Sequence, residues 1–190
     1  MIRLATPSDA AQMAEIYRPF VIQSPVSFET EAPDEAEMVD RVLSTLKTYP
    51  WLVAAKQGQV MGYAYASQHR ARYHYQWSVD VSVYIHPDFR RLGIGKALYQ
   101  PLMAILAVQG FVMAHAGITL PNEGSVGLHE AMGFKPIGVY RNVGYKLGQW
   151  HDVGWWELAL QAPQIDPAAP IPVGQVIGTP GWEMAMAASS

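Results

Sequence analysis

Cysteine is absent from this 190-residue chain, which excludes disulfides, thiolate zinc sites and a cysteine nucleophile. Charge is sparse too: charged residues make up 15% of the chain, and the net charge of -3 gives no general reason to expect a nucleic-acid partner. No apolar run approaches the roughly 20 residues of a membrane span, and no signal peptide is evident. We therefore expect a cytoplasmic enzyme or binding domain with no membrane partner.

The histidines offer no metal site either, because they lack the spacing of metal ligands with one another. Hydrophobic residues make up 50% of the chain, which suffices for one domain with a substantial core. We expect this domain at 1–160 and a tail rich in proline, alanine and glycine at 161–190. The tail is predicted to be irregular, with Trp182 either tying its end onto the body or preceding a disordered end after Ser189.

Hydrophobic periodicity predicts an alternation of strands and helices. The expected strands are 2–5, 51–55, 60–66, 79–85, 111–118, 134–140 and 153–160. The expected helices are 9–18, 34–47, one that opens near Gly93 and runs to about 109, and one that Asn122 or Ser125 caps and that runs to 132. Pro19 is expected to end the first helix, Pro101 to kink or break the third, and 141–152 to connect the last two strands.

The stretch between residues 79 and 99 carries the main functional signal. After the strand at 79–85, Arg90-Arg91-Leu92-Gly93-Ile94-Gly95 opens a helix. Glycine lets an anion approach the backbone, and the unpaired N–H groups at a helix N-terminus favour negative charge. With Arg90, Arg91 and Lys96 adding positive charge, the stretch predicts a phosphate site; the alternative is a simple turn with solvent-facing arginines.

Two familiar phosphate-binding patterns do not fit this turn. The Walker pattern requires a wider glycine spacing and a serine or threonine after the lysine, whereas Ala97 follows Lys96. The dinucleotide fingerprint requires a third glycine where Leu98 stands. What remains is Arg-x-x-Gly-x-Gly after a strand.

This turn, with Asn122 before a helix and Gly133-Phe134 before a late strand, resembles the GNAT N-acetyltransferases. Within that family the chain is most similar to the phosphinothricin N-acetyltransferase group, which includes enzymes acting on methionine sulfoximine and methionine sulfone. The motifs that carry this likeness are Ser27-Phe28-Glu29, Val83-Tyr84-Ile85, Leu120-Pro121-Asn122, Ser125, Leu128-His129-Glu130, Gly144-Tyr145-Lys146 and Trp150-His151-Asp152-Val153-Gly154. The resemblance covers about 2–160 and implies an α/β (α+β) fold in which helices flank a mixed central sheet.

The resemblance implies acetyl-CoA as the cofactor. The strand edge at Val83, Tyr84 and Ile85 would pair with the pantetheine arm, as an extended peptide pairs with an exposed strand. Asn122 would bond the pantetheine, with help from Ser125. The expected pyrophosphate-binding residues are Arg90, Arg91, Leu92, Gly93, Ile94, Gly95 and Lys96.

Two residues are candidates for the acid–base chemistry that an amine attacking a thioester requires. Asp80 precedes Val83 by three residues, where the group usually has Glu, so a bridging water is expected; the alternative is a structural Asp. His129 stands where many GNAT enzymes have a Tyr that protonates the leaving thiolate. The alternative for His129 is a capping or packing role against Gly133 and Phe134.

The candidate acceptor-binding residues are Phe28, Arg70, Arg72, Asp80 and Ser82. Guanidinium groups at Arg70 and Arg72 would hold a carboxylate, phosphinate or sulfone-type oxygen. We expect transfer of acetyl to the α-amine of a small amino-acid-like acceptor by direct attack on the thioester, in an enzyme of a kind that is often a homodimer. The alternatives are another amine (an antibiotic, a polyamine or a protein N-terminus) and a non-catalytic acyl-CoA-binding module.

Overall fold

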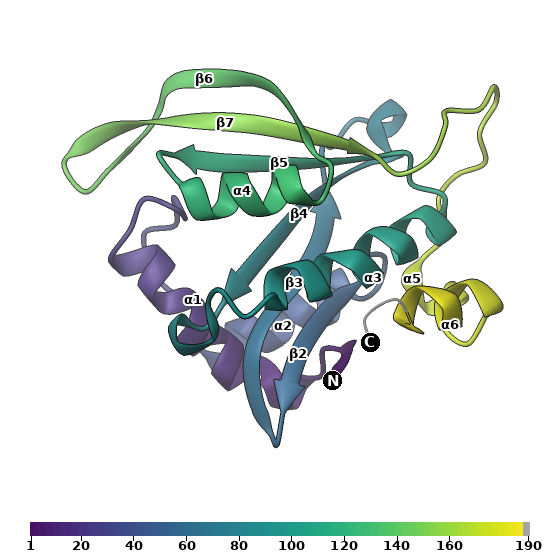
Figure 1. Ribbon diagram of the computed structural model, residues 1–190, viewed down its shortest axis with the longest axis horizontal. Helices are drawn as coiled ribbons and strands as arrows, with labels where there is room; N and C mark the ends of the chain where they lie inside the picture. The colour runs from purple at the N-terminus through teal and green to yellow at the C-terminus, as the bar shows by residue number, and fades with distance from the viewer. Residues whose placement is uncertain (188–190) are drawn as a thin grey trace.

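A single mixed sheet of seven strands organises the chain, in the order β1-β2-β3-β4-β5-β7-β6 (Figure 1). The computed structural model describes residues 1–187. The strands are β1 (Ile2–Leu4), β2 (Trp51–Lys56), β3 (Gln59–Gln68), β4 (Ser78–Ile85), β5 (Met113–Leu120), β6 (Lys135–Lys146) and β7 (Gln149–Ala159). The helices are α1 (Ala10–Ile22), α2 (Glu35–Thr45), α3 (Ile94–Gln109), α4 (Glu123–Ala131), α5 (Val173–Val176) and α6 (Pro180–Ala187), with 3-10 turns at Pro7–Asp9, Tyr73–Tyr75 and Pro87–Phe89.

The alternation within the strands produces two cores, one on each face of the sheet. Ala64 and Val79 belong to the core beneath α3, whereas Tyr63 and Trp51 belong to the core beneath α1 and α2. Successive side chains of a strand point to opposite faces, so Asp80 lies on the face opposite its neighbour Val79. In the described residues, no helix combines the length and the apolarity needed to cross a membrane.

The sheet opens between the neighbouring strands β4 and β5. β3 and β4 pair antiparallel along seven residues of β4, from Val79 to Ile85. β4 and β5 pair in parallel only at Ser78–Met113, Val79–Ala114 and Asp80–His115, after which the two strands separate. The remainder of β4 therefore keeps one edge of unpaired backbone groups facing a gap.

The first helix does not end at Pro19, as was expected, because α1 continues to Ile22. α3 continues through Pro101 as one helix, so the break expected there is wrong, whereas the kink stays a prediction. A proline removes one intrahelical hydrogen bond, and packing outweighs that loss here: Val21 after Pro19 is 1% exposed, and Leu102 after Pro101 is fully buried.

The expected connection at 141–152 was also wrong, because β6 and β7 form one long hairpin. The pairing has an irregularity between Tyr140 and Gly144, where Asn142 adopts a φ of 49°. Such a bulge breaks the period-2 alternation on which a strand prediction depends. The hairpin turns at Leu147 and Gly148, both with positive φ.

The tail at 161–190 is not irregular throughout, contrary to the expectation from its composition. α5 and α6 pack on α3, and Val173, Val176 and Trp182 join the core beneath that helix. Trp182, at 9% exposed, ties the tail to the body as one of the two alternatives proposed. The expected disordered end after Ser189 lies outside the described residues, and the domain boundary at 160 stays a prediction.

Candidate functional site

A hollow of about 60 Å³ lies where β4 and β5 separate. Six of the residues predicted from the sequence line it: Ser82, Val83, Tyr84, Asn122, Ser125 and His129. Asn122 is the N-cap of α4, because its Oδ1 accepts a hydrogen bond from the backbone N–H of Ser125 at 3.1 Å. The open strand edge and the start of α4 therefore face the same space.

The start of α3 supplies further backbone N–H donors, in addition to those on the open edge of β4. Its N-cap is Gly93, with a φ of 78°, and the first intrahelical bond runs from Ala97 N–H to the Gly93 carbonyl at 3.0 Å. The three residues between them, at 94–96, have no intrahelical acceptor for their N–H groups. A Cβ built on Gly93 would meet no atom within 4 Å, so the backbone there is open to an approaching group.

Positive charge gathers at the same helix start. Arg91 and Lys96 are exposed there, and the guanidinium of Arg90 lies over the Phe20 ring, 5.6 Å from its centroid. Gly95 has a different function from Gly93, since a Cβ on it would lie 2.8 Å from a methyl of Leu128. Gly95 thus permits close packing of α3 on α4.

Asp80 lies at the point where β4 and β5 part, on the face of the sheet that α1 and α2 cover. Its Oδ1 is 2.7 Å from Nδ1 of His69, which follows the end of β3. Burial raises the pKa of Asp80 above its ordinary value, and the hydrogen bond from His69 opposes that rise. The His69 ring stacks on His115 with centroids 4.3 Å apart.

His129 is 3% exposed and is held by two hydrogen bonds. Its Nδ1 lies 2.7 Å from the Ser125 carbonyl and must therefore donate, while its Nε2 lies 3.0 Å from the Tyr99 hydroxyl. Burial lowers the pKa of His129, so the ring is neutral and Nε2 accepts from Tyr99. The ring also packs edge-on against Phe134, so His129 both lines the hollow and packs the core.

Comparison with known proteins decides the family of this site. A model of the acetyltransferase (GNAT) domain matches residues 2–155. The chain belongs to the GNAT acetyltransferases. It is 42% identical over 176 residues to a phosphinothricin N-acetyltransferase of Streptomyces viridochromogenes, covering 92% of this chain and 95% of that protein.

A second relative, a Salmonella typhimurium L-methionine sulfoximine/L-methionine sulfone acetyltransferase, is 31% identical over 84% of this chain and 94% of its own. The solved phosphinothricin acetyltransferase from Sinorhizobium meliloti, in complex with AcCoA, superposes with a TM-score of 0.82 at 34% identity, covering 88% of this chain and 94% of that one. The resemblance and the fold class predicted from the sequence are confirmed.

This acetyltransferase uses acetyl-CoA, and its residues fit that cofactor. The open edge of β4 suits the amide-bearing pantetheine arm. The space beside Gly93 and the N–H groups that follow it suit the pyrophosphate. The two features are joined by the short segment 86–92, so one extended molecule can reach both.

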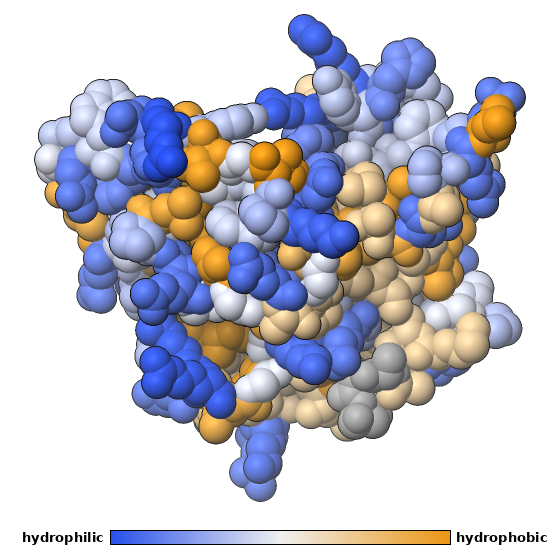
Figure 2. Space-filling model, turned by 45° about the horizontal axis from the view of Figure 1, so that its top comes forward, coloured by the Kyte–Doolittle hydropathy of each residue, from blue (hydrophilic) through white to orange (hydrophobic). Residues whose placement is uncertain are grey.

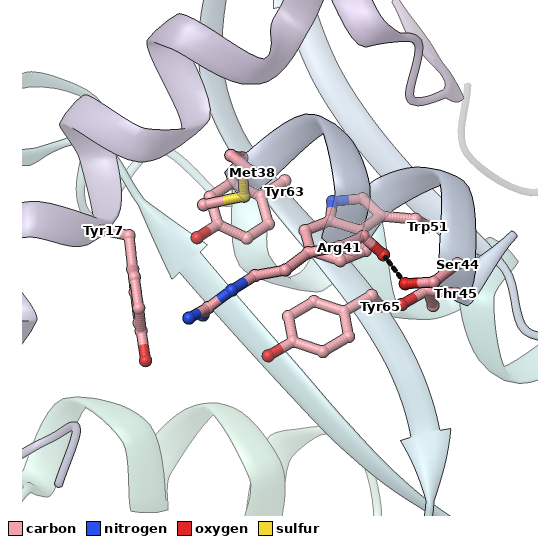
Figure 3. Close-up of a pocket in the computed structure, with 8 residues that line it drawn as sticks. All are labelled: Tyr17, Met38, Arg41, Ser44, Thr45, Trp51, Tyr63 and Tyr65. Atoms are coloured by element: carbon pink, nitrogen blue, oxygen red, sulfur yellow. Dashed lines mark hydrogen bonds between the residues drawn. The ribbon is translucent and has the colours of Figure 1, made fainter. Parts of the chain in front are cut away.

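A larger cavity of about 150 Å³ lies between α2 and strands β2 and β3 (Figure 3). Aromatic rings form much of its wall, and the guanidinium of Arg41 extends between Tyr17 and Tyr65. Arg41 already pairs with Glu29 at 2.9 Å and Glu37 at 2.5 Å. Because that charge is already paired, Arg41 is not free to bind a phosphate group in this cavity.

Of the predicted acceptor-binding residues, Ser82 lines the hollow, whereas Phe28, Arg70, Arg72 and Asp80 are not among its lining residues. Arg70 follows His69 and is close enough to Asp80 to affect its pKa, and Arg72 is exposed in the same loop. Phe28, in the segment between α1 and α2, packs against the β6–β7 hairpin at Gly144 and His151.

Sequence reasoning missed two partners, Tyr99 and His69. Each lies far along the chain from the residue it contacts: 30 positions separate Tyr99 from His129, and 11 separate His69 from Asp80. The arginine–glycine turn placed Tyr99 on a helix beside the phosphate site, which was the available signal for it. His69 was considered only as a metal ligand.

Proposed function

We propose that this enzyme acetylates the α-amine of a small amino-acid-like acceptor of the phosphinothricin, methionine sulfoximine or methionine sulfone type. The observation that carries the proposal is a carboxylate, Asp80, at the vertex where β4 and β5 part, on the face opposite the core beneath α3. The names of the relatives described above support the same acceptor class.

Acetyl-CoA supplies an acetyl thioester, which an amine attacks directly so that no acyl-enzyme is needed. The backbone of Val83, Tyr84 and Ile85 holds the pantetheine arm, with Asn122 and Ser125 beside it. The N–H groups at the start of α3 hold the pyrophosphate, together with the charges of the flanking side chains. The residues of this pyrophosphate group are Arg90, Arg91, Leu92, Gly93, Ile94, Gly95 and Lys96.

Asp80 binds the acceptor's ammonium group and takes one proton from it, directly or through water. Its half-buried setting supports this role, because burial raises the pKa of a carboxyl toward the range of a useful base. His129, neutral and accepting at Nε2, would orient the Tyr99 hydroxyl, whose proton would pass to the leaving sulfur and be replaced from water. Ser82, next but one to Asp80 on the same face, lies beside the acceptor.

The acceptor's oxygen atoms meet cationic and N–H donors. Arg70 and Arg72 lie in the loop after β3 and bind a carboxylate or a phosphinate. The indole Nε1 of Trp155 is buried and has no hydrogen-bond partner in the described part of the chain, so it offers another donor beside His69. Phe28 closes the pocket from the segment after α1.

We further propose that two copies associate through β6, and that the enzyme acts in the cytoplasm. β6 is the last strand of the sheet and exposes apolar side chains, among them Ile137, Val143 and Tyr145. Figure 2 turns the top of the molecule, where β6 and β7 lie in Figure 1, toward the viewer. Apolar side chains lie among hydrophilic ones on the surface that it shows. An unpaired apolar edge is a site for pairing with another chain.

The acceptor is tested by following CoA thiol release with purified protein and a panel of amines. Phosphinothricin, methionine sulfoximine and methionine sulfone should raise the rate above the acceptor-free rate, whereas faster release with a polyamine, an antibiotic amine or a peptide N-terminus would overturn the acceptor class. Asp80→Ala should lose at least about a hundredfold in rate while retaining cofactor binding. Asp80→Glu keeps a carboxylate and should retain more activity; equal rates for both variants would overturn the role of Asp80.

A further inference from the structure

His69 and Asp80 form a pair that the rest of the sheet holds in place. The 2.7 Å bond joins Nδ1 of His69 to Oδ1 of Asp80, and both side chains are partly buried, at 14% and 30% exposed. Asp80 is on a paired strand, and His69 is fixed by its stack on His115 and by edge contacts with Tyr75 and Trp155. A surface ion pair between mobile side chains has no such support.

We propose that His69 is a positioning residue for acetyl transfer, which holds the Asp80 carboxylate ionised and turns its second oxygen toward the acceptor's ammonium. The inference rests on the proposed function, in which Asp80 meets the amine. An Nδ1–H donor at 2.7 Å occupies Oδ1, so Oδ2 is the oxygen left to receive the ammonium proton. In that step an N–H bond breaks, an O–H bond forms, and the proton later leaves Oδ2 for water.

Burial and hydrogen bonding act in opposite directions on Asp80. Burial favours the neutral acid and raises the pKa, whereas the donor on His69 favours the anion and lowers it. Without His69, the pKa of Asp80 would be higher, so at a given pH a larger fraction of Asp80 would be protonated and unable to accept a proton. His69 therefore limits the rise in the Asp80 pKa that burial causes. It does so through Oδ1 and leaves Oδ2 free.

Other charged and titratable groups lie near the pair, in the loop after β3 and on strands β5 and β7. Arg70 lies in the same loop as His69 and also lowers the pKa of Asp80. His115 on β5 is opposite Asp80, and its own pKa is lowered by burial and by the nearby His69. Glu157 on β7 pairs with His115 in the sheet register, and Tyr75 meets the His69 ring edge-on. Among these groups, only His69 has a hydrogen bond to Asp80 in the described residues.

Two variants separate the hydrogen bond from the bulk of the ring. His69→Phe keeps an aromatic ring on His115 and removes the donor, whereas His69→Asn keeps an N–H donor near the position of Nδ1. Carboxyl ¹³C NMR of the protein alone, with the Asp80 signal identified by its loss in Asp80→Asn, follows the ionisation of Asp80 without acetyl-CoA or acceptor. His69→Phe should weaken that acid roughly tenfold, and His69→Asn should leave it near the parent value.

The pH dependence of kcat supplies the second measurement, with any amine that the enzyme accepts. Removing the donor should move the acidic limb to higher pH in His69→Phe, and His69→Asn should restore the parent limb. A structural role alone would lower the rate at every pH without moving the limb. His115→Phe is the matched control for NMR, since it removes an imidazole that stacks on His69 but has no hydrogen bond to Asp80, and the Asp80 ionisation should not change.

An unchanged Asp80 ionisation in His69→Phe would overturn the inference, as would equal shifts in His69→Phe and His69→Asn or in His69→Phe and His115→Phe. Failure of the proposed function looks different. If Asp80→Ala keeps the parent rate, the assignment of Asp80 is wrong, whereas the NMR titration still decides whether His69 controls the carboxyl.

Discussion

Asp9 is the most fully bonded carboxylate of the N-terminal region. Its side chain is 6% exposed, and both oxygens accept from Arg3 at 2.7 Å, with a further bond from Thr6 N–H at 2.8 Å. Burial alone would raise the pKa of Asp9, but the bonds from Arg3 and Thr6 outweigh it and leave the pKa lowered. Asp9 therefore stabilises the fold in its ionised form.

Asp9→Asn should lower the free energy of unfolding at pH 7 by about 2 kcal/mol, because hydrogen bonds to a charged group are lost. A carboxyl whose pKa is lower when folded stabilises the protein above its unfolded pKa, and that stability is lost as the pH falls through the folded pKa. Urea denaturation at pH 7 and pH 3 should show a difference that shrinks at the lower pH. Asp152→Asn, which breaks an exposed pair with Arg141, is the control and should change stability less. A difference for Asp9→Asn that is equal at both pH values would contradict this account.

Gly93 and Gly58 offer a matched comparison of backbone strain with cofactor binding. Both have positive φ, 78° and 81°, and neither would place a Cβ within 4 Å of another atom. Alanine at either position should destabilise the fold by about 1 kcal/mol, because L-residues disfavour this conformation. Only Gly93→Ala should weaken CoA binding in calorimetry, because only its Cβ enters the proposed pyrophosphate site. Equal CoA affinity in the two variants would contradict that site.

At the scale of the element, the sequence predicts what is local. The strand at 79–85, the helix after Gly93 and the Asn122 cap all depend on residues within one or two turns of one another, and they were predicted close to their observed places. The bulge near Asn142 was not predictable, because its cause is the pairing of β6 with β7. The same limit hid the His69–Asp80 contact, which exists only once β3 and β4 have paired.

The tail shows the limit in another form. Five prolines punctuate it, and proline-rich composition favours an irregular chain. Yet α6 begins at Pro180, where a proline loses no intrahelical bond, and Trp182 packs into the core beneath α3. Composition measures the average behaviour of a segment, whereas one buried aromatic residue can decide its place.

The segment between α1 and α2 is fastened to β6 by one lysine. Nζ of Lys146 donates to the carbonyls of Val21, Ser27 at 2.5 Å and Glu29 at 3.0 Å. Burial lowers the pKa of Lys146, and the nearby Glu29 opposes that effect. This fastening positions Phe28, which lies between two of the bonded carbonyls in the chain.

Lys146→Met keeps the apolar stem and removes all three bonds. We expect KM for the acceptor to rise several-fold and the free energy of unfolding to fall by about 1–2 kcal/mol, with CoA affinity unchanged. Steady-state kinetics, calorimetry and urea denaturation measure the three effects. Lys135→Met, at an exposed position on the same strand, is the control and should alter none of them. A parent-like KM in Lys146→Met would show that the segment holds its place without these bonds.

At the scale of the whole molecule, the sheet consists of two parts that meet along a short seam. β1 to β4 form one part and β5, β7 and β6 the other, joined in the sheet by the three residue pairs at the start of β4 and β5. The first part ends at β1, a strand of three residues, whereas the second ends at the twelve residues of β6. A short edge strand offers little to pair with, so association is expected at β6.

Val143 and Leu43 test this association as a matched pair, since both are apolar and similarly exposed, at 51% on β6 and 48% on α2. The parent should have twice the 21.0 kDa mass of the chain in light scattering. Val143→Lys should reduce it to that of one chain, because a buried lysine without a partner opposes the interface, whereas Leu43→Lys should not. If the parent itself scatters as a single chain, β6 is an exposed edge and not an interface. If both variants dissociate, the contact lies on a broader surface that includes α2, and the pairing of two β6 edges is wrong.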